Sequence, residues 1–196
     1  GGLTRLAVDF GIPEEQSRSF HSQTVHLDEQ PPLKIVLNHP LKTVTRTALA
    51  RHHLQEIEKA ANVEVATGTK VAGLTDSSIA TDRGDFSFRV LVAADGSQSV
   101  VRRHVGLPSK FGIGLYYEAP QRSDEVLFQF RPGIIRSGYL WVFPHRDCTN
   151  VGIGFNPDTL TAGLAKVILH QYMKEKGFAA NGARLKGRTI SQVYRG

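Results

Sequence analysis

The sequence predicts a mixed α+β fold in which an antiparallel sheet dominates, and three observations support this prediction. Apolar and polar residues alternate over several short segments, which is typical of half-buried strands. Two longer segments repeat apolar residues at helical spacing. Clusters of Gly, Asp, Ser and Thr separate the strand-like segments and indicate tight turns. The expected order is strand, helix, β-meander, helix, antiparallel strands and helix.

The first half of the chain contains the first strand, the first helix and the meander. Residues 33–37 alternate and are expected to form a half-buried strand. Residues 45–61 carry apolar side chains at helical spacing, and Thr45 is expected to be the N-cap. Residues 63–95 are expected to form successive strands separated by turns. The end of this meander, residues 91–94, is apolar on both faces, which is typical of a strand buried from two sides.

The second half begins with a short helix and continues with antiparallel strands. The short helix is expected within residues 97–106, directly after the Asp-Gly pair. The segment 126–130 alternates and predicts a strand. Residues 138–144 and 150–155 flank a short polar loop and are expected to pair as a hairpin.

The clearest helical pattern in the sequence covers residues 158–177. Asp158 is expected to cap its N-terminus, and Gly177 follows the last turn. The lysines of the last turn favour a helix C-terminus, because they complement the helix dipole. The predicted buried stripe consists of Leu160, Leu164, Val167, Ile168, Gln171 and Tyr172.

Composition excludes several classes of protein. The 196 residues can bury a sizeable core in one large or two small domains. No apolar run is long enough to span a membrane, and the first residues lack the pattern of a signal peptide. The single cysteine, Cys148, excludes an internal disulfide and, without a CxxC pair, argues against a structural zinc site. The net charge of +6 favours anionic partners, but the basic residues are dispersed, so nucleic-acid binding is not expected.

The segment VLVAADGSQSVVRR places an acid and a glycine between an apolar strand and a helix. Gly96 allows close approach of a ligand or of another backbone, and a serine such as Ser99 can cap the helix. Arg102 lies one turn further on, where it could pair with a phosphate or hold the Asp95 loop. The strand-to-helix edge of an α/β sheet is a common ligand site. A plain capped turn, with Arg102 in solvent, explains the same residues.

The residues Asp95-Gly96-x-x-Ser99-x-x-Arg102 match the DGxxSxxR motif of para-hydroxybenzoate hydroxylase-like FAD-dependent oxidoreductases. In that family the motif is described as meeting the FAD pyrophosphate and the approaching NADPH. The segment that begins at Arg46 also resembles a family helix whose leading arginine reaches the FAD. The resemblance therefore implies FAD as cofactor and NAD(P)H as electron donor. The alternative for Arg46 is an exposed residue of a first helical turn.

A second match is to the YxWxFPx₇₋₈GxG motif of the geranylgeranyl reductase branch, which lines a cavity for a prenyl lipid. It is formed by Tyr139, Trp141, Phe143, Pro144, Gly152 and Gly154. With a four-residue loop, hairpin pairing places Trp141 opposite Gly152 and Tyr139 opposite Gly154. Large rings opposite glycines would leave a trough for a long apolar chain. Alternatively, the aromatic residues fill a core, and the glycines make room for the rings.

Other chemically active residues do not form a recognisable site. His52 and His53 lie on one helix without a third ligand, so no metal site is expected. His145 and Cys148 share a loop, but no orienting acid or oxyanion element accompanies them. The catalytic residues therefore stay unknown.

The resemblance implies a division of the chain into three parts. Residues 1–44 and 108–196 would belong to a substrate-binding sheet, and residues 45–107 to part of an FAD-binding domain. The GxGxxG loop and the later Gly-Asp motif of the family do not occur in this sequence. We therefore expect the central portion of a longer flavoprotein, whose missing N- and C-terminal segments are its partners, and little activity or FAD binding from this portion alone.

For the parent protein, the resemblance implies reduction of carbon–carbon double bonds in an isoprenoid lipid. The alternatives are a flavin-dependent aromatic hydroxylase or monooxygenase and a non-enzymatic lipid-binding module. The expected location is the cytoplasm, with peripheral membrane contact if the substrate is a phospholipid.

Overall fold

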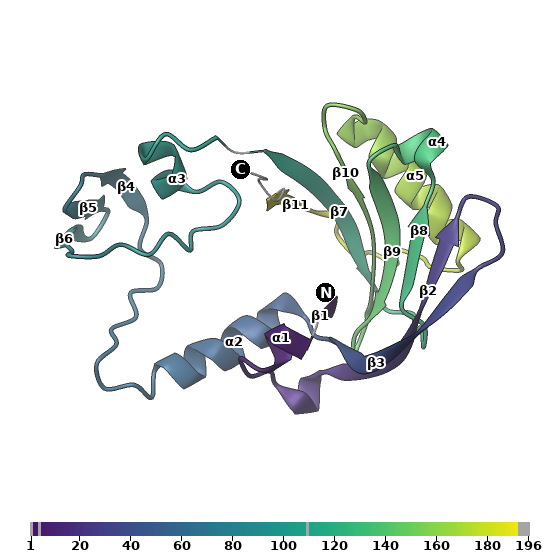
Figure 1. The fold of residues 1–196 in the computed structure, drawn as a ribbon, viewed down its shortest axis with the longest axis horizontal. Helices are drawn as coiled ribbons and strands as arrows, with labels where there is room; N and C mark the ends of the chain where they lie inside the picture. Colours follow the sequence, from purple (N-terminus) through teal and green to yellow (C-terminus); the bar gives the residue numbers. More distant parts are fainter. Residues whose placement is uncertain (1, 4, 109, 192–196) are drawn as a thin grey trace.

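A curled eight-stranded sheet is the larger of the two sheets in the fold (Figure 1). The computed structural model describes residues 2–3, 5–108 and 110–191. The strand order is β1-β3-β2-β8-β9-β10-β7-β11, and neighbours are antiparallel except β2 and β8. This confirms the predicted mixed fold with mainly antiparallel pairing. The strands are β1 (Gly2–Leu3), β2 (Arg18–Leu27), β3 (Leu33–Thr43), β7 (Phe111–Ala119), β8 (Leu127–Phe130), β9 (Gly138–Pro144), β10 (Thr149–Phe155) and β11 (Lys186–Ser191).

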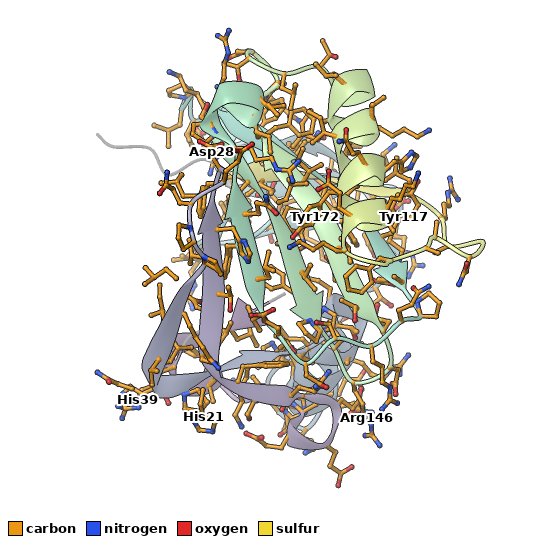
Figure 2. The ribbon with its side chains drawn as sticks, turned by 90° about the vertical axis from the view of Figure 1, so that its right-hand side faces the viewer. His21, Asp28, His39, Tyr117, Arg146 and Tyr172 are labelled. Carbon is orange, nitrogen blue, oxygen red and sulfur yellow. The ribbon has the colours of Figure 1, made fainter. Side chains whose placement is uncertain are left out.

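Helix α5 (Ala162–Glu175) covers one face of this sheet and forms the main core with it. Figure 2 shows Tyr172 on this helix and Tyr117 from β7 at the same interface. The Tyr117 hydroxyl lies 2.9 Å from Nε2 of His170, which fixes the helix on the strand. The buried helix residues are Ala165, Ile168, Leu169, Tyr172 and Met173.

The predicted start and the predicted buried face of α5 are corrected by the structure. Thr161 caps the helix instead of Asp158, because its hydroxyl accepts the N–H of Leu164 at 3.3 Å. Leu164 and Val167 are 51% and 61% exposed, since the small Ala165 lets the neighbouring face approach the sheet. The end of the helix is confirmed: Gly177 has a φ of +73°, and the two hydrogen bonds of a Schellman motif close the last turn.

The middle of the chain forms a helix and a small three-stranded meander. Helix α2 (Arg46–Ile57) begins at the predicted N-cap, where the Thr45 hydroxyl accepts the N–H of Ala48 at 3.2 Å. The helix ends four residues before the predicted boundary, and Ala48 is its one buried residue in the described range. The meander consists of β4 (Val71–Leu74), β5 (Ser78–Thr81) and β6 (Gly84–Ser87). The remaining short helices are α1 (Arg5–Val8), η1 (Glu14–Gln16), α3 (Val100–His104) and α4 (Pro132–Ile135).

The predicted strand at residues 91–94 is wrong for this structure. The segment forms no regular element and pairs with no strand in the described part of the chain. Val90 and Val92 are 80% and 78% exposed. Alternation and apolar content favour a strand, but a strand also requires a neighbour with free backbone groups, and none lies beside this segment.

Candidate functional site

The Asp-Gly corner has the hydrogen bonds of a capped helix start. Asp95 Oδ2 accepts the N–H of Val100 at 2.6 Å, and the Ser99 hydroxyl accepts the N–H of Arg102 at 2.9 Å. The hydrogen bond from the Ser99 side chain, together with the backbone N–H groups of Val100 and Val101, holds the pKa of Asp95 below its ordinary value. The carboxylate therefore stays ionised at neutral pH and orders the turn that precedes α3.

The corner is open to solvent. Asp95 and Gly96 are exposed, and Gly96 has a φ of +85°, which favours glycine. No heavy atom lies within 4 Å of the position that a Cβ at Gly96 would occupy. The Arg102 side chain is half-buried, and among the described residues its guanidinium has no hydrogen-bond partner or ion pair. The turn is therefore accessible to a ligand, and the cofactor roles of these residues stay a prediction.

Arg46 is the first residue of α2, and its side chain is exposed. Within the described ranges, no hydrogen bond or ion pair joins it to the corner. Figure 1 shows α2 and α3 as separate elements connected through the meander. The structure therefore does not bring Arg46 into contact with Asp95 or Arg102.

The register of the β9–β10 hairpin agrees with the prediction. Trp141 pairs with Gly152, and Tyr139 pairs with Gly154. On the other side of the hairpin, Leu140 and the residues whose side chains point the same way belong to the core beneath α5. Because side chains alternate along a strand, the rings of Tyr139, Trp141 and Phe143 lie on the sheet face away from α5. By the same alternation Pro144, which is fully buried, does not lie with these rings.

The space above Gly152 is occupied by Trp141. A Cβ at Gly152 would lie 2.5 Å from Cε2 of the indole, and the indole also lies near Gly154 and Gly114. The Trp141 Nε1–H donates to Asn150 Oδ1 at 2.7 Å, and the residue is only 8% exposed. The predicted trough above Gly152 is thus filled by the indole, as in the alternative interpretation that the glycines make room for the rings.

The rings belong to a larger cluster, here called the aromatic face, that also includes two residues of β8. Its members are Phe128, Phe130, Tyr139, Trp141 and Phe143. Phe128 lies 5.2 Å from Phe143 and 5.7 Å from Tyr139 between ring centroids, and Phe130 lies 5.6 Å from Tyr139. Phe130 is 36% exposed, and burial raises the pKa of Tyr139, so its phenol is neutral. The alternation of residues 126–130 predicted this strand, but not that its phenylalanines join the hairpin rings.

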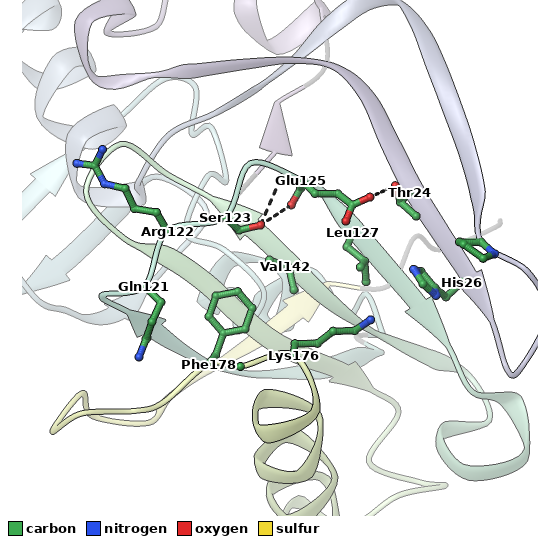
Figure 3. Close-up of a pocket in the computed structure, with 12 residues that line it drawn as sticks. Thr24, His26, Gln121, Arg122, Ser123, Glu125, Leu127, Val142, Lys176 and Phe178 are labelled. Atoms are coloured by element: carbon green, nitrogen blue, oxygen red, sulfur yellow. Dashed lines mark hydrogen bonds between the residues drawn. The ribbon is translucent and has the colours of Figure 1, made fainter.

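A separate cavity of about 450 Å³ lies on the opposite, α5-covered face (Figure 3). Leu127, Val142 and Phe178 contribute apolar walls, and Lys176 extends along it towards His26. Burial, and then the positive charge of Lys176, lower the pKa of His26, which favours its neutral form. None of the residues predicted from the sequence as site residues lines this cavity.

Three further observations concern the cysteine, metal binding and membrane insertion. Burial raises the pKa of the Cys148 thiol, so the thiol is poorly suited to act as a nucleophile. Among the described residues, no cluster of three or more metal-ligating side chains occurs. Nor does any helix of the described ranges have the length and apolar character needed to cross a membrane.

The sequence is similar to parts of known proteins. No protein-family model matches the sequence. The chain is 28% identical over 207 residues to an uncharacterized protein of Methanosarcina barkeri, covering 97% of this chain and 52% of that protein. It is 32% identical over 98 residues to digeranylgeranylglycerophospholipid reductase 2 of Methanothermobacter thermautotrophicus, covering 45% of this chain and 26% of the reductase. The chain therefore spans about half, or less, of the relatives that it matches.

Solved structures show the same fold at lower identity. A geranylgeranyl bacteriochlorophyll reductase-like protein from Thermoplasma acidophilum matches with a TM-score of 0.74 at 19% identity, covering 97% of this chain and 54% of that protein. The peptidyl tryptophan dihydroxylase QhpG matches with a TM-score of 0.66 at 16% identity, covering 97% and 47% of the two chains. In sequence and in fold, the chain is therefore similar to a partial region of the geranylgeranyl reductase-like FAD-dependent oxidoreductases.

Proposed function

We propose that the chain is the central portion of an FAD-dependent oxidoreductase that reduces carbon–carbon double bonds of an isoprenoid lipid. In the net reaction one carbon receives a hydride derived from NAD(P)H and the other receives a proton. The observation that carries the proposal is the aromatic face, which is partly exposed at Phe128, Phe130 and Tyr139 and lies on the sheet side away from α5. Helices α2 and α3 lie beyond this same side in Figure 1.

The Asp-Gly corner fits the phosphate-bearing part of a dinucleotide. The open space beside Gly96 allows a phosphate to approach the backbone closely, and the guanidinium of Arg102 can pair with it. Asp95 and Ser99 would hold the turn in shape during binding. Arg46, exposed at the start of α2, would reach the cofactor from a second element. FAD, when bound, supplies the hydride-transfer chemistry, and these residues supply binding and orientation.

Exposed apolar side chains support the assignment of residues 45–107 to part of an FAD-binding domain. Monomeric proteins rarely leave many large apolar residues of one segment in solvent. The segment ahead of the corner exposes Val90 and Val92 almost completely. We infer that additional strands of a parent protein would pair with it and cover these side chains. The exposed apolar residues of this region are Ile57, Val63, Val65, Val71, Phe86, Val90, Val92, Val105 and Leu107.

The isoprenoid class of substrate is supported by the chemistry of the aromatic face. Phe128, Phe130 and Tyr139 present flat apolar surfaces without a charged group among them. A polyprenyl chain has only apolar and π-bonded surface, so contact with these rings excludes water from both partners. One relative, by name a digeranylgeranylglycerophospholipid reductase, acts on such a lipid. If the substrate is a phospholipid, the parent protein would contact the membrane surface, with its bulk in the cytoplasm.

The proposed lipid contact predicts a fluorescence response from Trp141, the single tryptophan of the chain. Addition of geranylgeraniol should shift or quench the Trp141 emission in a saturable way. The substitution Phe130→Asp should weaken this binding at least about tenfold, the factor that loss of about 1.5 kcal/mol of apolar contact produces. The matched control is Val167→Asp, which places the same charge at an exposed apolar residue of α5 on the other face. Equal affinities for the two variants would contradict the proposal.

The second prediction concerns the cofactor. We expect FAD to bind the purified chain weakly or not at all, because the corner supplies one phosphate contact region and no GxGxxG loop occurs in this sequence. Equilibrium dialysis with FAD, with and without the substitution Arg102→Ala, measures this affinity. A yellow protein that retains FAD through purification would contradict the expectation.

The main alternative within the flavoproteins is an aromatic hydroxylase or monooxygenase, and hydroxylases occur among the structures with this fold. A hydroxylase would accept a compact aromatic substrate and would couple NAD(P)H oxidation to oxygen insertion. A non-enzymatic lipid-binding module would bind geranylgeraniol, and this binding would be the same with and without flavin. Assay of a full-length parent for NADPH oxidation with geranylgeranyl lipid separates these alternatives.

A further inference from the structure

The serine in the middle of the Asp-Gly corner contacts a different part of the molecule from its neighbours. Asp95 and Ser99 both bind backbone N–H groups of α3. Ser97, in contrast, lies against β11, an edge strand of the large sheet. Its hydroxyl donates to the carbonyl oxygen of Thr189 at 3.2 Å and lies 2.5 Å from the Thr189 hydroxyl. Both hydrogen bonds can form at once, because the Ser97 hydroxyl donates to the carbonyl oxygen and accepts from the Thr189 hydroxyl.

This contact joins the segment 58–107 to the large sheet. Residues 58–60 also bond to the end of the adjoining helix α2, as in the ion pair between Lys59 and Glu56. The other hydrogen bonds and ion pairs that the described residues of this segment make stay within it, such as that between His104 and Asp76. The chain itself connects the segment to the sheet at two places, through α2 after β3 and through the residues between α3 and β7. Figure 1 shows the loop ahead of α3 approaching β11, away from the β3–α2 connection.

Two connections leave a rotation free, and a third contact removes it. A body joined to a sheet by two chain segments can still turn about the line through them. A hydrogen-bonded contact away from that line fixes the angle. Thr189 is itself held in the sheet, because it pairs with Ile113 of β7. Ser97 is held in the corner, because its neighbours on both sides cap α3.

We propose that Ser97 and Thr189 are positioning residues that lock the Asp-Gly corner against the edge of the sheet. This inference rests on the proposed function for its purpose: the lock sets the position of the cofactor-binding turn relative to the aromatic face. Neither residue is assigned contact with substrate or cofactor. Hydride transfer tolerates little error in the separation of the reacting atoms, so a fixed angle between these two parts favours the reaction.

A distance measurement tests the lock without any cofactor. In a Cys148→Ser background, cysteines replace Val105 at the end of α3 and Val167 on α5, both exposed, and carry spin labels. Pulsed electron paramagnetic resonance then gives the distribution of label–label distances. We expect one narrow distribution in this background. The substitution Ser97→Ala removes both hydrogen bonds and should lose the narrow component. Thr189→Val keeps the carbonyl acceptor and removes only the hydroxyl contact, so it should broaden the distribution less, and the double variant should be no broader than Ser97→Ala.

Two further variants separate the lock from general destabilisation. Ser87→Ala removes a hydroxyl from the same segment, at an exposed residue that makes no side-chain hydrogen bond in the described structure, and should leave the distribution narrow. Thr189→Ser keeps the hydroxyl and should do the same. Circular dichroism verifies that each variant is folded. A broad distribution in the background protein, or a narrow one in Ser97→Ala, would overturn the inference. Since no flavin or lipid is present, the result is independent of whether the proposed function holds.

Discussion

The substitution Gly152→Ala is expected to lower the free energy of unfolding by about 3 kcal/mol, near the upper end of typical overpacking costs. The added Cβ would lie 2.5 Å from Cε2 of Trp141 and 2.7 Å from the carbonyl oxygen of Leu115. Side-chain carbons do not come this close in folded proteins, and the backbone of β7 cannot withdraw without breaking its pairing with β10. Trp141 must therefore leave its position. Urea denaturation measures the loss, and a red shift of the native Trp141 emission would report the displaced indole.

The second glycine of the same motif provides the matched control. A Cβ at Gly154 would lie 3.5 Å from the Trp141 ring and 4.0 Å from the carbonyl oxygen of Tyr139, both ordinary contact distances. Gly154→Ala should therefore change stability by less than about 1 kcal/mol, and the lower chain entropy of alanine in the unfolded state offsets part of any cost. Equal destabilisation by the two substitutions would show that Trp141 does not lie above Gly152.

The contrast between these glycines shows which features of the hairpin could be predicted from the sequence and which could not. The hairpin register was predictable, because a four-residue loop and strict alternation leave one pairing that buries the aliphatic side chains together. The position of the indole was not, because a ring opposite a glycine can either lean over it or stand away from it. The choice depends on Asn150, whose side chain accepts the indole N–H, and on the third strand, where Gly114 leaves room.

Strands that lack a strong local pattern could not be predicted from the sequence, because they depend on partners elsewhere in the chain. β2 and β11 contain many polar and charged residues, and they are strands because partners in the sheet present free backbone groups to them. The opposite error occurred at residues 91–94, where local pattern favours a strand but no partner is present. Ser97 likewise carried no signal, because its partner Thr189 lies 92 residues away in the chain.

The stability of the chain should fall between pH 6.5 and about 3 because of one histidine. His145 follows β9, is 2% exposed, and its Nδ1 has no hydrogen-bond partner among the described residues. Burial, assisted by the positive charge of Arg18, lowers its pKa from 6.5 to about 3. Below pH 6.5 the unfolded chain therefore binds a proton that the folded chain does not bind, and unfolding becomes more favourable as the pH falls. The free energy of unfolding should be about 2–3 kcal/mol lower at about pH 4.5 than above pH 6.5, because each pH unit between the two pKa values lowers it by about 1.4 kcal/mol.

The substitution His145→Phe isolates this effect from the carboxylates. Asp95 and Glu175 also have lowered pKa values, but their contributions to stability are lost only at lower pH and persist in the variant. Urea denaturation between about pH 4.5 and 7.5 should give a clearly smaller slope of stability against pH for His145→Phe than for the parent chain. The control His21→Phe makes the same replacement at an exposed residue of β2 and should keep the parental slope. Parallel slopes for the parent and His145→Phe would mean that His145 takes up its proton in the folded state, and that its burial does not exclude the charge.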